Sequence, residues 1–141
     1  MYKIKIFSIN KTKEPWLQEA LEEYEKRLKA IMPIEWIFAK NNEQLRLFLS
    51  KENSFIALSP SALEMTSPQF SAYLYTQLES FGSRLTFVIG GAEGLPQDLI
   101  AEAFQSISLS KLTLTHQMAR LLLIEQIYRA TEIQKGSNYH K

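Results

Sequence analysis

The stretch LTFVIGGAEGLP, Leu85–Pro96, joins an apolar run directly to a glycine-rich loop. Leu85–Ile89 is the strongest candidate in the chain for a central β-strand. Three of the five glycines follow it within five residues, Gly90–Gly94. Glycine permits positive φ angles and close approach of another group to the backbone. A helix is predicted next, over residues 97–104, so this stretch has the strand–loop–helix order of an α/β protein.

The same order recurs on both sides of this stretch. Apolar patterning predicts further strands at residues 2–9, 34–39, 54–58 and near 107–109. Helices are predicted between them, beginning at Thr12 as the cap with Pro15 in the first turn, near Leu45, and at Ser67. Leu17, Leu21, Tyr24, Leu28 and Ile31 form one apolar stripe, which Pro33 ends. Repeated strand–helix units predict one α/β domain over residues 1–141, with a mostly parallel sheet and helices on both faces.

Composition excludes some classes of protein and of site but does not identify the function. The chain has 141 residues, 45% hydrophobic and 22% charged, which is ordinary for a globular protein. No apolar run approaches the roughly 20 residues that cross a bilayer, and the start lacks a signal-peptide layout. The absence of cysteine excludes disulfides and thiolate metal sites and fits a cytoplasmic location. The net charge of +1 means that basic residues must be locally arranged if the protein binds RNA.

Ligands of parallel α/β sheets bind beyond the carboxyl ends of the strands. Three segments are expected there: Leu58–Pro60, Gly90–Gly94 and Leu109–His116. The glycines match neither a dinucleotide-binding fingerprint nor a phosphate loop, and a tight connection is their simplest interpretation. In the last segment, free backbone groups could read an adenine edge while Leu112 and Leu114 pack on its faces. The alternative is a surface turn that ends in a helix N-cap at Thr115.

The closing helix has no clean polar face. Met118, Leu121, Leu122, Ile124 and Ile127 surround it, which predicts burial in a core or against a second copy of the chain. Arg120, Glu125 and Arg129 are a charged minority, and Glu125 can pair with Arg129 at i, i+4. The alternative is a solvated stripe, but isolated charges among residues that need burial are costly unless they are paired or used.

Four phrases together resemble the ribosomal large-subunit methyltransferase H family, small enzymes of the SPOUT class. They are FVIGGAEGLP (residues 87–96), SLSKLTLTH (108–116), EQIYRA (125–130) and the terminal NYHK (138–141). The resemblance implies a C-terminal trefoil knot and a homodimer with active sites at the subunit interface. It implies S-adenosylmethionine-dependent methylation of N3 of a pseudouridine in 23S ribosomal RNA, on assembled ribosomes, with no metal.

The resemblance also implies the site residues. The cofactor-binding positions are Leu58, Gly91, Ser110, Lys111, Leu112, Thr113, Leu114 and Thr115. The candidate catalytic and substrate positions are His116, Arg120, Glu125, Arg129, Tyr139 and His140. His140, His116 or Glu125 could take the N3 proton, Arg120 or Arg129 could hold phosphate or steady the base, and Tyr139 could stack on it.

Several positions depart from the family pattern. Ser59, Ala62 and Leu63 stand where the family has an aspartate and a Gly-Lys pair. Thr115 and Asn138 replace the prolines before the two histidines. Two alternatives therefore stay open: a SPOUT methyltransferase with a different RNA target, and a non-catalytic dimeric domain that binds RNA or the ribosome. Both methyltransferase hypotheses require binding of S-adenosylmethionine, and the non-catalytic binding domain does not, so a binding measurement would distinguish them.

Overall fold

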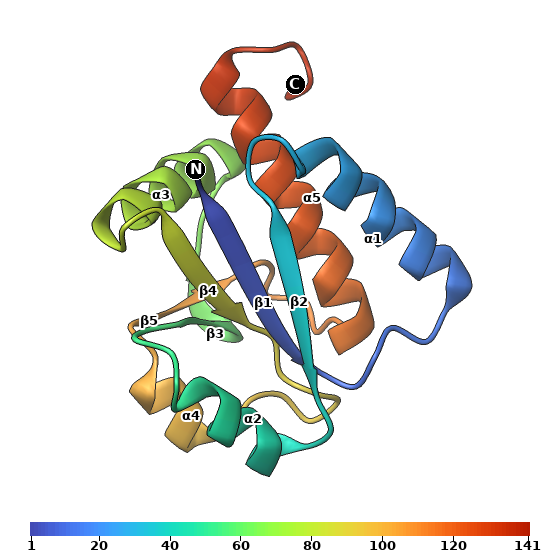
Figure 1. Cartoon of the computed structure of the whole chain (residues 1–141), viewed down its shortest axis with the longest axis vertical. Helices are drawn as coiled ribbons and strands as arrows, with labels where there is room; N and C mark the ends of the chain where they lie inside the picture. The colour runs from blue at the N-terminus through green and yellow to red at the C-terminus, as the bar shows by residue number, and fades with distance from the viewer.

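Five parallel strands form one sheet in the order β2-β1-β4-β3-β5 (Figure 1). The computed structural model describes all residues, 1–141. The strands are β1 (Lys3–Ile9), β2 (Ile34–Ala39), β3 (Ile56–Glu64), β4 (Arg84–Val88) and β5 (Gln105–Ser108). β4 pairs with β1 on one side and β3 on the other, which confirms its predicted central position.

Helices connect the strands and cover both faces of the sheet, as predicted. They are α1 (Pro15–Leu28), α2 (Asn42–Leu49), α3 (Ser67–Ser80), α4 (Gln97–Glu102) and α5 (His116–Lys135). α1, α3 and α5 pack with Ile4, Ile6 and Phe87 on one face. Phe7 and Val88 point the other way, because strand side chains alternate, and pack with α2 and α4.

α5 crosses the back of the sheet between α1 and α3 (Figure 1). The chain reaches it from β5 at one edge of the sheet through residues 109–115. α5 begins beside the carboxyl end of β1, because Gln117 and Arg120 bind residues 8–13 there. This path is the one that a C-terminal trefoil knot needs; the knot itself stays a prediction.

α2 and α4 cover only part of their face. Their apolar partners Ile9, Ala39 and Val88 lie at the carboxyl ends of the strands. The amino-terminal part of the same face carries Lys3 and Lys5 and has no helix over it (Figure 1).

Two of the differences from the predicted element boundaries have a structural cause. Thr12 does not cap α1: Glu14 is the N-cap residue and makes no side-chain cap bond, while the Thr12 hydroxyl accepts a hydrogen bond from Arg120. β3 continues past Leu58 to Glu64, because Leu63 and Glu64 pair again with β5 after an irregular register. Residues 59–62, which lie beyond the predicted strand 54–58, are therefore an irregular part of the β3–β5 pair.

Candidate active site

A cleft of about 390 Å³ lies at the carboxyl ends of β4 and β5, beside Leu58–Pro60 of β3. All three predicted segments contribute to it. Six of the eight predicted cofactor positions line it: Leu58, Gly91, Ser110, Leu112, Thr113 and Leu114. Lys111 and Thr115 do not line it, because Thr115 caps α5 by accepting a hydrogen bond from the Met118 amide and the Lys111 amide donates to Glu64. Sequence reasoning missed Leu95, in the loop before α4, and Ile100 and Ala119, whose only signal was apolar helix periodicity.

The glycine loop is a tight turn that forms one wall of the cleft. The Gly94 amide donates to the Gly91 carbonyl at 3.0 Å, and Gly94 has a φ of +80°. A Cβ atom on Gly90 would lie 2.5 Å from the carbonyl carbon of Gly94. Only glycine fits at position 90 without moving the loop. This steric requirement agrees with the interpretation of the glycines as a tight connection.

Gly90→Ala is expected to weaken binding of S-adenosylmethionine at least about tenfold, because the displaced loop changes the wall of the cleft. Isothermal titration calorimetry measures this affinity. Gly82→Ala is the matched control: Gly82 has a φ of +68°, but a Cβ atom added there would have no other atom within 4 Å, and the residue is remote from the cleft. It should cost about 1–2 kcal/mol of stability and leave the affinity unchanged. Equal affinities for both variants would contradict this role of the loop.

The loop before α5 presents unused backbone groups. The Leu112 amide donates to the Ser110 hydroxyl at 3.0 Å, and the Ser108 hydroxyl donates to the Ser110 carbonyl at 2.9 Å. These bonds fix the turn. The backbone N–H and C=O groups of Thr113 and Leu114 bind no other group of the chain. A cleft with leucine side chains and free backbone donors and acceptors fits the adenine end of a nucleoside cofactor.

His116 lines the cleft at the first turn of α5. Burial lowers the pKa of His116 below its usual 6.5, and the nearby cations Arg120 and Lys13 lower it further. Its Nε2 atom lies 3.2 Å from the Gln117 side-chain nitrogen, which donates to it in the neutral tautomer with the hydrogen on Nδ1. His116 is therefore neutral at pH 7 and can accept a proton.

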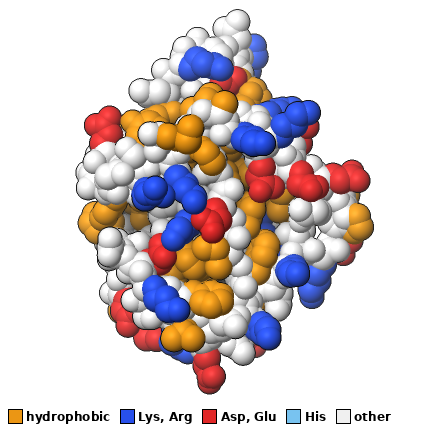
Figure 2. All heavy atoms as spheres, in the orientation of Figure 1, with side chains coloured by type: hydrophobic (Ala, Val, Ile, Leu, Met, Phe, Trp, Pro, Cys, Tyr) orange, Lys and Arg blue, Asp and Glu red, His pale blue; other side chains and the backbone are white.

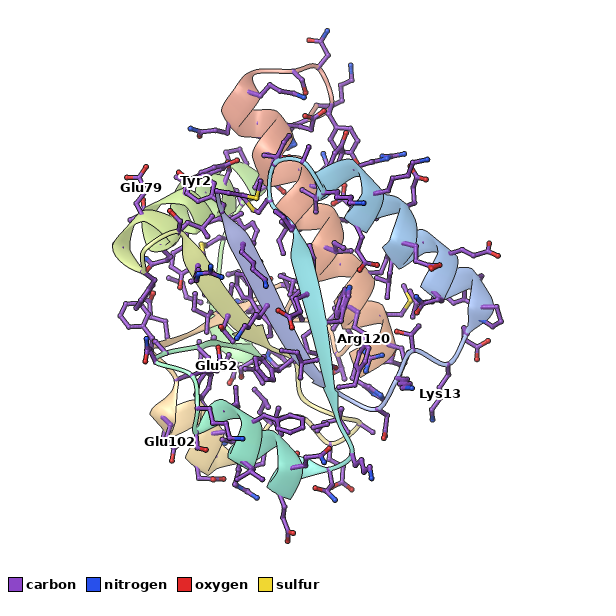
Figure 3. The ribbon with its side chains drawn as sticks, viewed as in Figure 1. Tyr2, Lys13, Glu52, Glu79, Glu102 and Arg120 are labelled. Carbon is purple, nitrogen blue, oxygen red and sulfur yellow. The ribbon has the colours of Figure 1, made fainter.

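Arg120 is completely buried, with 0% exposure, and points from α5 to the end of β1 (Figure 3). Its guanidinium donates to the Ser8 hydroxyl at 3.0 Å, the Ile9 carbonyl at 2.7 Å and the Thr12 hydroxyl at 3.0 Å, and also to the Asn10 carbonyl and Gln117. Burial lowers the pKa of Arg120 to about 10, so it stays charged at pH 7. All its donors are used within the chain, which favours a positioning role over substrate contact.

Four predicted catalytic residues meet at the other end of α5. Arg129 donates to the Glu125 carboxylate at 2.8 Å, which confirms the predicted i, i+4 pair. Gly136 ends the helix in a left-handed conformation and turns the tail back. The Tyr139 hydroxyl then donates to Glu125 at 2.8 Å, and the Arg129 guanidinium lies 4.8 Å from the centre of the Tyr139 ring.

The same cluster sets the protonation of its members. Arg129 lies 3.1 Å from Nδ1 of His140. A guanidinium has donors only, so Nδ1 accepts this hydrogen bond. Burial, together with the bond to Glu125, raises the pKa of Tyr139 well above 10, so its hydroxyl stays protonated.

The two ends of α5 are far apart within one chain. Nine residues separate His116 from Glu125 and thirteen separate it from Arg129. At 1.5 Å per residue these are about 14 Å and about 20 Å along the helix. A single chain therefore has a cleft with His116 at one end of the helix and the polar cluster of Glu125, Arg129, Tyr139 and His140 at the other.

Comparisons with known proteins agree with this fold. A family model described as "Predicted SPOUT methyltransferase" matches residues 2–140. The chain is 53% identical over its full length to the full-length ribosomal RNA large subunit methyltransferase H of Protochlamydia amoebophila. It is 41% identical to the protein of the same name from Ruminiclostridium cellulolyticum, over 99% of both chains.

A solved structure shares the fold at low sequence identity. The crystal structure of TrmJ from Z. mobilis ZM4 superposes with a TM-score of 0.54 at 10% identity, over 92% of this chain and 69% of the other. The parallel sheet, the helix arrangement and the relatives lead to one assignment. The chain belongs to the SPOUT methyltransferase family, with the ribosomal RNA large subunit methyltransferase H proteins as its relatives.

Proposed function

We propose that the protein methylates N3 of a pseudouridine in 23S ribosomal RNA, on assembled ribosomes in the cytoplasm, with S-adenosylmethionine as the methyl donor. The observation that carries this proposal is the full-length identity of 53% to a protein named for methylation of large-subunit RNA, together with the intact polar cluster at the end of α5. No helix of the chain is long and apolar enough to span a bilayer.

The cleft would hold the cofactor. Free backbone groups of Thr113 and Leu114 would bind the adenine edge, with Leu58 and Leu112 against its faces. Gly91 would line the cleft with its backbone, while a Cβ atom added there would meet the Ile9 side chain at 3.4 Å. When bound, S-adenosylmethionine supplies an electrophilic methyl group, so the chain has to align the nucleophilic nitrogen and exclude water. Lys111 and Thr115 would act through the shape of the loop.

The polar cluster would bind and prepare the target base. Tyr139 would stack on it after Arg129 leaves the ring, and Arg129 would then steady the negative charge that develops when N3 loses its proton. Glu125, His116 or His140 would accept that proton. His140 Nδ1 is occupied by Arg129, so His140 could accept a proton there only after Arg129 moves to the substrate.

A homodimer would bring the cleft of one chain to the polar cluster of its partner. The separation along α5 supports this arrangement, because one chain does not unite the two halves. Leu63 and Leu112, near the cleft, are 80% and 74% exposed. Burial of such leucines against a second copy would be favourable, by roughly 25 cal/mol per Å² of apolar surface.

Mass spectrometry of ribosomal RNA tests the activity. Purified protein with S-adenosylmethionine should add one methyl group to one pseudouridine of ribosomes that lack the modification. Methylation of another nucleotide would instead favour the alternative of a different RNA target, for which Ser59, Ala62 and Leu63 are the motivation. Failure to bind the donor would favour the non-catalytic binding domain.

Co-expression of two impaired variants, assayed at a donor concentration too low to saturate Gly90→Ala, tests the composite site. Gly90→Ala subunits lack a proper cleft, and Arg129→Met subunits lack a proper cluster. Random pairing makes about half of the dimers heterodimers, and in each heterodimer one of the two sites combines an intact cleft with an intact cluster. The mixture should therefore recover about one quarter of wild-type activity. If each site were built within one chain, the mixture would stay as inactive as its parents.

A further inference from the structure

A second cleft, of about 290 Å³, opens on the part of the sheet that α2 and α4 leave uncovered. Its floor is formed by Lys3 and Lys5 of β1 and by Arg84 and Thr86 of β4, and residues 51–55 form its wall. Figure 2 shows Lys and Arg side chains gathered over this region, and Figure 3 shows Glu52 among them. The cleft lies at the amino ends of the strands, so the cofactor cleft is at the opposite ends, about 13 Å away along the five residues of β4.

The charge of this cleft differs from that of the whole chain. Four cations line it, Lys3, Lys5, Lys51 and Arg84, against one carboxylate, Glu52. Its net charge is +3, whereas the chain has +1, so the remaining residues carry a net −2. The low net charge of the chain therefore hides a local excess of positive charge in this cleft.

Part of this charge is free to bind an anion. Glu52 is used within the chain: it binds Lys5 at 3.1 Å and accepts from the Thr86 hydroxyl at 3.1 Å. Lys3 pairs with Glu35 at 3.0 Å. Lys51 and Arg84 form no ion pair with any carboxylate of the chain. A polyanion can bind both without breaking an existing contact.

An aromatic pair borders the same cleft. Phe81 lines it, and its ring lies edge-on to Phe104 with the centroids 5.0 Å apart. Phe104 is 50% exposed. A basic groove bordered by an exposed aromatic side chain is the combination that binds single-stranded nucleic acid, with the phosphates on the cations and a base on the ring.

We propose that this cleft binds the sugar–phosphate backbone of a single-stranded segment of ribosomal RNA, as a docking contact separate from the methylation site. RNA as the occupant rests on the proposed function and on charge complementarity with a phosphate chain. The contact gives the enzyme affinity for its substrate without reading the target base.

The double variant Lys51→Gln/Arg84→Gln tests the proposal by direct binding to ribosomes in sedimentation. Loss of two phosphate contacts should raise the Kd about tenfold or more at moderate salt and lower the slope of log Kd against log salt concentration by about 1.5. The affinity for S-adenosylmethionine should not change. Lys29→Gln/Lys40→Gln removes the same charge from two exposed lysines outside the cleft and is the matched control.

Equal Kd values and salt slopes for the cleft variant and the control would overturn the proposal. A weaker Kd with an unchanged salt slope would also overturn it, because the contact would then be to a ribosomal protein rather than to phosphate. The assay measures binding, so it is readable even if no methyl transfer is found. Failure of the methyltransferase proposal and failure of the docking cleft are therefore distinguishable.

Discussion

Arg129→Met is expected to lower kcat/KM for methylation of ribosomal RNA by about 10²–10³-fold, the cost of removing one preorganised donor from a reacting site. Arg129 holds Glu125, His140 and the Tyr139 ring in one cluster, so its loss removes a charge and also frees the tail. The Kd of S-adenosylmethionine should change less than twofold, because no residue of the cluster lines the cofactor cleft and the partner's cluster would contact the target base rather than the donor. Single-turnover kinetics on ribosomes and calorimetry measure the two quantities.

One further variant tests whether the charge of Arg129 is sufficient without its planar shape, and a second variant is the control. Arg129→Lys keeps the positive charge but loses the planar fork, and should recover only part of the activity. Arg27→Met is the control, because Arg27 lies 5.3 Å from the Tyr128 ring centre but pairs with Glu23 outside the cluster. Arg129→Met as active as Arg27→Met would show that the cluster has no part in the reaction.

Arg120→Met is expected to lower the free energy of unfolding by about 3–5 kcal/mol, because it leaves buried polar groups without a partner. The carbonyls of Ile9 and Asn10 and the hydroxyl of Ser8 all accept from this guanidinium. The melting temperature should fall by about 10 °C or more. Urea denaturation and calorimetry of wild type and variant measure both.

A surface ion pair provides the comparison for Arg120. Arg46 binds Asp98 at 2.7 Å, but both side chains are largely exposed. Arg46→Met should cost less than about 1 kcal/mol. If Arg120→Met cost no more than that, water would replace the guanidinium as a donor, and the structural role assigned to Arg120 would be wrong.

Periodicity predicted the strands and helices whose pattern of buried residues is visible within a short stretch of sequence. The alternation in residues 2–9 and the apolar run at 85–89 were sufficient for β1 and β4, and Thr115 was found because a cap needs only its own helix. Thr12 was assigned to the wrong partner, because Arg120 lies 108 residues away and no local pattern reports such a bond. β3 was predicted too short because Leu63 and Glu64 pair with β5 across a bulge.

The candidate site was predicted in its residues but not in its arrangement. The i, i+4 spacing of Glu125 and Arg129 indicated their pair, whereas the return of Tyr139 to Glu125 depends on the left-handed turn at Gly136. The basic cleft was not predicted at all. Lys3, Lys51 and Arg84 come from three separate parts of the chain, and a net charge of +1 averages them with acidic residues elsewhere.

The buried bonds between Arg120 and the end of β1 also bear on how the protein is made. Ser8 is translated 112 residues before Arg120, and α5 is the last helix to be synthesised. Until α5 arrives, the nascent sheet lacks the helix that lies between α1 and α3, and the polar groups at the end of β1 lack their donor. Folding from the amino end can start during synthesis, but the sheet gains its central covering helix only once α5 has been made, and until then its uncovered apolar face is open to aggregation.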